Sequence, residues 1–487
     1  MNLKITFTGK TFEELKIGVR FDGEERFAFI LCNRAEHNGN IKLIPQELIF
    51  AKPEDYNSVS AGHYQLKNEF VNFVVNKALQ QGKDIIQVHS HPFSPGRYSS
   101  IDARTELKLM RHISEKIENI YHASMVFAQD LKTLDSWFFD PDTQTLKPTE
   151  KVLVIHPDKI EIQSAFKGDD YLQNRDFQDR TIRAFGQDSL KIFKTLDIGI
   201  VGASGTGGPL TEQLVRTGIK KITICDPDGI EASNLNRLQG AGLKDIGKNK
   251  AVFYKNYLES LIPDLRIEAI SSSFYEIQVQ EKFALLDVIF SCVDSGAIHS
   301  INRLAMANLI PLFMLNSGIE VEQEKTNFIG GQVYSIFPGT KVCINCLGGF
   351  ENLLHEYLDQ ESIEREIRQG YVKGANIIQP QVYFLNSMIV ALGFWQFLQY
   401  ALGLQKPALK IYLDALKNKI TASTIQDPEG CIICREDSYL GKGNNVSFLI
   451  PRKSIELEDL PDATDQNQSS AKKAKTETND NRGPSSL

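Results

Sequence analysis

The sequence lacks a long uninterrupted apolar run. Its most apolar stretch, residues 382–404, is interrupted by Asn386, Gln396 and Gln399, so it predicts a buried or interface helix rather than a membrane span. Residues 1–4 lead into polar sequence instead of the apolar core of a signal peptide. We therefore expect a cytoplasmic protein that has no membrane partner.

An excess of positive charge is also missing. The net charge is -7, from 54 Lys and Arg against 61 Asp and Glu, and a nucleic-acid surface needs a basic balance. Cysteine is scarce, with seven in 487 residues; this odd number argues against a disulfide framework and favours thiols or metal ligands. We expect no nucleic-acid partner, and the chain length indicates two or three domains.

The stretch from Ile198 to Arg237 has the layout of a nucleotide site. A short apolar run at 198–201 predicts a buried parallel strand, a glycine turn and a helix-like segment follow, and a second strand is expected at 221–225. The glycines and the acid that ends the second strand are Gly202, Gly205, Gly207 and Asp226. Glycines let the backbone approach phosphate, a helix N-terminus attracts it, and the acid holds a ribose hydroxyl.

The loop after Asp226 narrows the choice of nucleotide. It supplies a second carboxylate, Asp228, together with Asn234 and Arg237, and these groups suit a triphosphate and Mg²⁺. A nicotinamide dehydrogenase, which needs little beyond the ribose acid, is a weaker alternative. Further along, Lys250 opens a predicted helix where it is able to reach phosphate, and a buried strand ends in Asp294.

This order of groups resembles the ThiF/MoeB family of ATP-dependent adenylating proteins, which includes the activating enzymes for ubiquitin. The resemblance covers roughly residues 180–435, and its most specific part is D-x-D followed by S-N-L-N-R. It implies that ATP and Mg²⁺ bind here. The resemblance implies that Asp226 binds the ribose and that Asn234, Arg237 and Lys250 contact the phosphates. Asp294 would lie near Mg²⁺ and the acyl phosphate. Arg180 resembles the arginine that one subunit of such a homodimer contributes to the site of the other.

A second motif lies in the first third of the chain. His89 and His91 follow an apolar strand at i and i+2, so both face one side, and Ser99 and Asp102 complete the pattern H-x-H, seven residues, S-x-x-D. Two imidazoles and a carboxylate suit Zn²⁺ and leave its fourth position open for a water. Glu25 is the candidate general base. A polar loop followed by a capped helix start is the plainer alternative.

This motif resembles the JAMM signature of the JAB/MPN metalloprotease family. The resemblance implies zinc binding by His89, His91 and Asp102, and oxyanion stabilisation by Ser99. It also implies hydrolysis of peptide or isopeptide bonds at ubiquitin-like C-termini. The apolar register favours Glu25 over the adjoining Glu24.

Two C-x-x-C pairs predict a second zinc site. Four thiolates close a tetrahedral site and leave no position for a substrate, so this zinc would be structural. The pairs are Cys343 with Cys346 and Cys431 with Cys434. The other cysteines, Cys32, Cys225 and Cys292, lie in apolar strand-like sequence, which indicates buried inert thiols. We therefore expect adenylation without an internal thioester.

Together these features predict an α/β protein: a mixed α+β JAB-like domain at 1–155, a Rossmann-like doubly wound adenylation domain at 165–450, and a polar, disordered tail at 452–487. The expected function is adenylation of the C-terminal glycine of a ubiquitin-like protein, joined to zinc-dependent cleavage of its precursor tail or its conjugates. The alternatives are sulfur-carrier activation for cofactor biosynthesis and a non-catalytic binding scaffold. The expected partners are a small ubiquitin-like or sulfur-carrier protein, a conjugating enzyme or sulfurtransferase, and a second copy of the chain.

Overall fold

A computed structural model describes residues 1–60, 63–91, 100–116, 119–163, 175–262, 264–293, 297–322, 325–347, 380–423, 431–435 and 438–446. Met1–Glu351 and Pro380–Ile450 form one compact unit, and the elements named below belong to it. The predicted tail at 452–487 lies outside the described residues.

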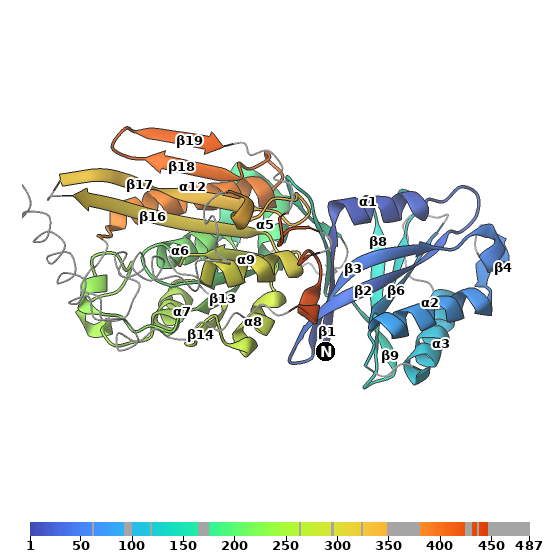
Figure 1. Cartoon of the computed structure of the whole chain (residues 1–487). Helices are drawn as coiled ribbons and strands as arrows, with labels where there is room; N and C mark the ends of the chain where they lie inside the picture. The colour runs from blue at the N-terminus through green and yellow to red at the C-terminus, as the bar shows by residue number, and fades with distance from the viewer. Residues whose placement is uncertain are drawn as a thin grey trace, which may run out of the picture. The chain divides into compact units, whose positions relative to one another are not determined.

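Two large sheets dominate this unit (Figure 1). The strands are β1 (Asn2–Thr8), β2 (Phe27–His37), β3 (Asn40–Phe50), β4 (Tyr56–Ser60), β5 (His63–Leu66), β6 (Asp84–Ser90), β7 (His122–Phe127), β8 (Leu134–Asp140), β9 (Thr145–Pro148), β10 (Lys151–Ile155), β11 (Ile160–Gln163), β12 (Asp197–Val201), β13 (Lys221–Cys225), β14 (Arg266–Ile270), β15 (Val288–Ser291), β16 (Leu312–Glu322), β17 (Lys325–Ile336), β18 (Lys410–Asp414) and β19 (Lys419–Ser423). The α-helices are α1 (Gly9–Gly18), α2 (Asn68–Gln81), α3 (Ser100–Lys116), α4 (Arg175–Phe185), α5 (Gln187–Thr195), α6 (Gly207–Thr217), α7 (Lys250–Leu261), α8 (Ile277–Ala284), α9 (Ala297–Ala307) and α12 (Tyr383–Ala401).

The first sheet is mixed and has helices on both faces. Its nine strands run in the order β11-β10-β1-β3-β2-β6-β7-β8-β9. Alternate residues of β2 enter different cores, because side chains of a strand point to opposite faces: Phe27 and Phe29 pack with α2, whereas Ala28 and Ile30 pack with α1. The sheet is therefore buried on both faces, as the continuous apolar runs in its sequence require.

The second sheet has the doubly wound arrangement that the glycine stretch predicts. Its strands run β14-β13-β12-β15-β16-β17-β18-β19, and β12 pairs in parallel with both β13 and β15. Strand order reverses at β12, so the crevice beyond the carboxyl ends of β12 and β15 is the place where such sheets bind ligands. The Rossmann-like fold is confirmed, and the two strands expected at 198–201 and 221–225 are β12 and β13.

Most of the apolar stretch at 382–404 forms α12, which packs against β16, β17 and α6. All three polar interruptions of this stretch, Asn386, Gln396 and Gln399, are buried in the protein. None of the helices within the described ranges is long and apolar enough to cross a membrane.

Buried charge joins the two sheets. Asp287, fully buried before β15, accepts hydrogen bonds from Lys4 of β1 at 2.9 Å and from Lys151 of β10 at 2.6 Å. Lys151 also lies 2.8 Å from Asp197, the first residue of β12. Burial favours the neutral forms, but the lysines hold the pKa of Asp287 below its ordinary value, and the two aspartates raise the pKa of Lys151.

A third buried lysine crosses the same junction. Lys42 of β3 donates to the carbonyl oxygens of Leu286 at 2.7 Å and Asn308 at 3.4 Å. These residues follow α8 and α9, so the lysine satisfies carbonyls near two helix C-termini, where a donor is favoured. Burial lowers the pKa of Lys42 well below its ordinary value, and the charge of Lys4 acts in the same direction.

We predict that Asp287→Ala lowers the free energy of unfolding by about 3–5 kcal/mol, because it leaves two buried ammonium groups with one carboxylate between them. Urea unfolding at pH 7, followed by circular dichroism, measures this loss. Asp188→Ala is the control, since Asp188 is exposed and pairs with Lys191 on one helix, and we expect it to leave the midpoint unchanged. Equal midpoints for the two variants would show that the junction does not depend on this carboxylate.

Candidate functional site

The glycine turn after β12 leaves no room for side chains at two positions. Gly202 has φ +91°, and a Cβ there would lie 2.7 Å from the carbonyl oxygen of Cys292. A Cβ on Gly207 would lie 1.8 Å from the carbonyl oxygen of Gly202. The backbone therefore folds back on itself so tightly that only glycine fits, as the sequence pattern implies.

The turn leads directly into α6. Thr206 precedes the helix, and its side chain makes no capping hydrogen bond. The first N–H groups of a helix have no partner within it and carry a partial positive charge. This helix start is therefore suited to an anion such as phosphate.

Asp226 ties the turn to the next loop. It follows β13, is 4% exposed, and accepts hydrogen bonds from the backbone N–H of Ala203 at 2.7 Å and of Asp228 at 2.9 Å. Burial raises its pKa, and the neighbouring Lys250 opposes that shift. Each carboxylate oxygen accepts more than one hydrogen bond, so Asp226 is able to hold a ribose hydroxyl while it fixes the turn.

Lys250 provides a buried cation beside this acid. It is the first residue of α7, and the side chain of Asn249 caps the helix by accepting from the N–H of Val252. The ammonium of Lys250 lies 3.0 Å from Asp228, whose carboxylate is mostly exposed. The structure thus brings together a cation and the second carboxylate that the sequence singles out.

Asn234 and Arg237 occupy the loop in different ways. Asn234 is buried, and its Oδ1 accepts from the N–H of Glu231 at 3.2 Å, so it shapes the loop from within. Arg237 donates to the carbonyl oxygen of Ser233 at 2.9 Å, and its Cδ would lie 3.3 Å from a Cβ on Gly205. Arg237 therefore lies against the glycine turn. Asn234 instead stabilises the loop, and the sequence did not predict this structural role.

Two further residues are predicted for this site. Arg180 is exposed on α4, where its expected role in a partner subunit stays a prediction. Asp294 lies outside the described residues.

The three cysteines outside the C-x-x-C pairs are buried, as expected. Burial raises the pKa of Cys225 to about 12 and that of Cys32 well above its ordinary value. Cys292 lies at the end of β15, beside the glycine turn. Because the thiolate is the nucleophile, Cys32 and Cys225 are poor candidates for a thioester.

In the first sheet, His89 and His91 converge. Their Nε2 atoms are 3.0 Å apart, close to the roughly 3.3 Å that separates two nitrogen ligands of a tetrahedral zinc. The Nδ1 atom of His89 lies 3.4 Å from the carboxylate of Glu106 on α3, and both side chains are buried. A carboxylate behind an imidazole is the usual support of a zinc-bound histidine, so this pair of residues fits the metal.

Glu25 belongs to the same face. Strand β2 pairs antiparallel with β6, with Phe27 opposite His89; Glu25 lies two residues before Phe27, and His91 lies two residues after His89. Opposed residues of a strand pair share a face. Glu25 is buried, whereas Glu24 is exposed, so the burial pattern agrees with the choice of Glu25.

The rest of the first motif is outside the described residues: all of Ser99 and the side chain of Asp102, whose backbone lies in α3. Glu106 was missed in the sequence, where only its position one helical turn after Asp102 hinted at a shared role.

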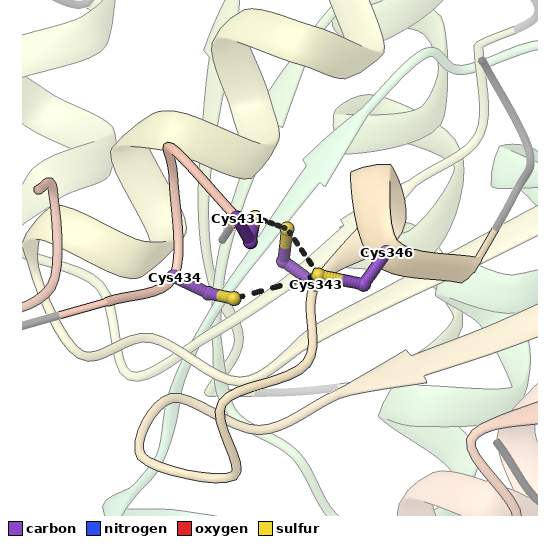
Figure 2. Close-up of side chains that lie close together, drawn as sticks. All are labelled: Cys343, Cys346, Cys431 and Cys434. Carbon is purple, nitrogen blue, oxygen red and sulfur yellow. Dashed lines mark hydrogen bonds between the residues drawn. The ribbon is translucent and has the colours of Figure 1, made fainter. Parts of the chain in front are cut away.

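The four paired cysteines meet, as the C-x-x-C spacing predicts (Figure 2). The sulfur atoms are 3.9 Å apart for Cys343 and Cys346, 3.8 Å for Cys343 and Cys431, and 3.5 Å for Cys346 and Cys434. Four sulfurs at 2.3 Å from a tetrahedral zinc would lie about 3.8 Å from one another. The cluster therefore has the dimensions of a Cys₄ zinc site.

Comparison with known proteins adds independent information. The chain is 27% identical over 185 residues to ubiquitin-like modifier-activating enzyme 5 of Dictyostelium discoideum. This aligned region covers 36% of this chain and 46% of that protein. It is 30% identical over 197 residues to the adenylyltransferase and sulfurtransferase UBA4 of Meyerozyma guilliermondii, covering 38% and 46%. The chain spans less than half the length of these two relatives.

Among solved structures, Escherichia coli MccB with ATP is similar at 18% identity, covering 55% of this chain and 76% of that one, with a TM-score of 0.43. The model of the ThiF family matches residues 178–427, which include the glycine turn, the loop after Asp226 and α7. This match covers more than half of the chain, and the chain belongs to the ThiF family.

Proposed function

We propose that the protein uses ATP and Mg²⁺ to adenylate the C-terminal glycine of a small ubiquitin-like or sulfur-carrier protein. The observation that carries this proposal is that Asp226 and Arg237 both lie against the glycine turn that opens α6, with the ammonium of Lys250 paired to Asp228 in the adjoining loop. The names of the relatives, two of which are activating or adenylylating enzymes, support the same reaction.

In the proposed reaction, a carboxylate oxygen of the substrate attacks the α-phosphorus of ATP. The bond from that phosphorus to the oxygen bridging to the β-phosphate breaks, and pyrophosphate leaves with the electron pair. Negative charge grows on the phosphate oxygens, where Arg237, Lys250 and the N–H groups of α6 stabilise it. Asp226 orients the ribose, and Asp228 and Asp294 are the proposed carboxylates for Mg²⁺.

The activated carboxylate would then pass to an acceptor outside the chain. The burial and raised pKa of Cys32 and Cys225 support this step of the proposal. The acceptor would be a conjugating enzyme in a modification pathway or a sulfurtransferase in cofactor biosynthesis. We further propose that the protein forms a homodimer in which Arg180 of each subunit enters the nucleotide site of the other.

A second activity, zinc-dependent cleavage next to a ubiquitin-like C-terminus, is favoured by the convergence of His89 and His91. These residues and Asp102 would hold the zinc, and Glu106 would orient His89. When bound, the zinc supplies an acidified water. Glu25, buried on the same face, would accept the proton of that water, and Ser99 would donate a hydrogen bond to the oxyanion.

We expect Arg237→Ala to lower ATP–pyrophosphate exchange by about 10²–10³-fold, because it removes a donor that stabilises transition-state charge. The assay adds a purified small ubiquitin-like protein with a C-terminal glycine and follows labelled pyrophosphate into ATP. Arg216→Ala is the matched control, since Arg216 lies in the last turn of α6 and pairs with Glu212. Wild-type protein that binds NAD and exchanges no pyrophosphate would contradict the proposal.

For the hydrolase, Glu25→Gln should reduce cleavage of a ubiquitin-like fusion by at least about a hundredfold, within the range typical of a lost general base. Pyrophosphate exchange and zinc content should stay at wild-type levels. The neighbouring exposed Glu24→Gln is the control. If Glu24→Gln lost cleavage while Glu25→Gln stayed active, the general base would be Glu24 and the assignment of Glu25 would be wrong.

Metal analysis should find two zinc ions per chain. Cys431→Ser should lose one of them and lower the melting temperature, because a structural zinc contributes directly to folding. His89→Ala should lose the other. Cys32→Ala is the control and should retain both zinc ions, because Cys32 belongs to neither group of zinc ligands. Inductively coupled plasma mass spectrometry counts the ions. A Cys431→Ser variant that kept two zinc ions would refute the Cys₄ assignment.

A further inference from the structure

We propose that Asn386 is a further ligand-binding residue of the nucleotide site, and that its Nδ2 donates a hydrogen bond to a phosphate oxygen held in the glycine turn. This inference rests on the proposed adenylation function and adds to it a residue far along the chain from the glycine motif.

Asn386 is placed by α12, whose first turn carries it. The helix packs against β16 and α6, and Asn386 is 1% exposed. All nineteen residues of α12 are uncharged, so the amide is the polar group that this part of the helix brings to the turn. The loop after Asp226 reaches the same helix end, because Asn236 donates to the carbonyl oxygen of Gln381 at 2.9 Å.

The amide has a fixed orientation. The hydroxyl of Ser317, on β16, donates to Oδ1 of Asn386 at 2.6 Å. This bond satisfies the acceptor end and turns the NH₂ end the other way. Nδ2 is buried, and it has no hydrogen-bond partner among the residues that the structure describes. A buried donor without a partner costs free energy unless a ligand or water satisfies it.

Nδ2 faces the glycine turn. A Cβ on Gly205 would lie 2.1 Å from Nδ2 of Asn386, so a side chain at this position would displace the amide. The φ of Gly205 is outside the left-handed region, so backbone conformation does not require glycine there. The absence of a Cβ at Gly205 is what lets the Asn386 amide approach so closely.

The same small region holds a cation. The Cδ of Arg237 would lie 3.3 Å from the Gly205 Cβ position, so the arginine and the amide flank one glycine. Both are hydrogen-bond donors, and they stand beside the start of α6, whose N–H groups attract anions. An amide N–H aimed at this point contributes a donor without adding charge. The geometry therefore matches an anionic oxygen, which is what a nucleotide phosphate presents.

The test compares ligands with and without phosphate by isothermal titration calorimetry on the full chain. Asn386→Ala should weaken the binding of Mg²⁺ with a non-hydrolysable ATP analogue about tenfold, the usual effect of losing a hydrogen bond to a charged group. Asn386→Asp should weaken it further, since a carboxylate would face the phosphate. Neither change should alter the affinity for adenosine, which lacks phosphate. Ser387→Ala, on the next residue of α12, is the control and should bind both ligands normally.

Two results would overturn the inference. One is an ATP-analogue affinity in Asn386→Asp equal to that of the wild type. The other is a parallel loss of analogue and adenosine affinity, which would show that Asn386 only holds the fold. Ser317→Ala should weaken analogue binding by a few-fold, because the amide loses its orientation. Pyrophosphate exchange by the wild type reports separately on the proposed function, so exchange combined with either overturning result refutes the role of Asn386 alone.

Discussion

The buried carboxylate of Asp287 is the constraint on which the arrangement of the compact unit depends. Two lysines of the first sheet are buried against it, and buried ammonium groups are tolerated only where an opposite charge meets them. The contact lies at the amino ends of β12 and β15, whereas the glycine turn lies at the carboxyl end of β12. Strand β12 has five residues, so about 17 Å of strand separates the two. The sheets are joined without covering the edge at which we propose that the nucleotide binds.

At that carboxyl edge, single residues serve the fold and the site together. Asp226 accepts from the glycine turn and from its own loop, and its carboxylate is thereby held in place before any ligand arrives. Asn234 shapes the loop that presents Arg237. Such fixed dipoles and charges need little reorganisation when charge develops on a phosphate, which is how a preorganised site lowers a barrier. The turn tolerates no side chain at Gly202 or Gly207 for a separate, steric reason, because a Cβ at either position would meet a backbone carbonyl oxygen.

The sequence was informative where the signal is local and poor where it depends on distant contacts. Strands 198–201 and 221–225 and the Cys₄ cluster were predictable, because a run of apolar residues, a glycine spacing or a C-x-x-C pair constrains neighbouring positions directly. Lys4, Lys42 and Lys151 carry no comparable signal: each lies in a largely apolar strand, and the groups that they meet at the junction are 44 to 283 residues away. Asn386 was visible only as an interruption of an apolar stretch. Its meaning required knowing that α12 returns to the glycine turn.

The two proposed activities are linked by the chemistry of one carboxylate. Cleavage of a peptide bond after the terminal glycine of a ubiquitin-like precursor releases the free carboxylate that adenylation consumes. Burial raises the pKa of Cys225 to about 12, which disfavours the nucleophilic thiolate near neutral pH, so this residue is a poor internal trap for the adenylate. The activated group would therefore remain exposed to external nucleophiles, including water, until an acceptor arrives. A protein that forms no internal thioester would need to transfer the adenylate quickly to its acceptor. Hydrolysis of the adenylate regenerates the free carboxylate, and the ATP that formed the adenylate is then consumed without transfer.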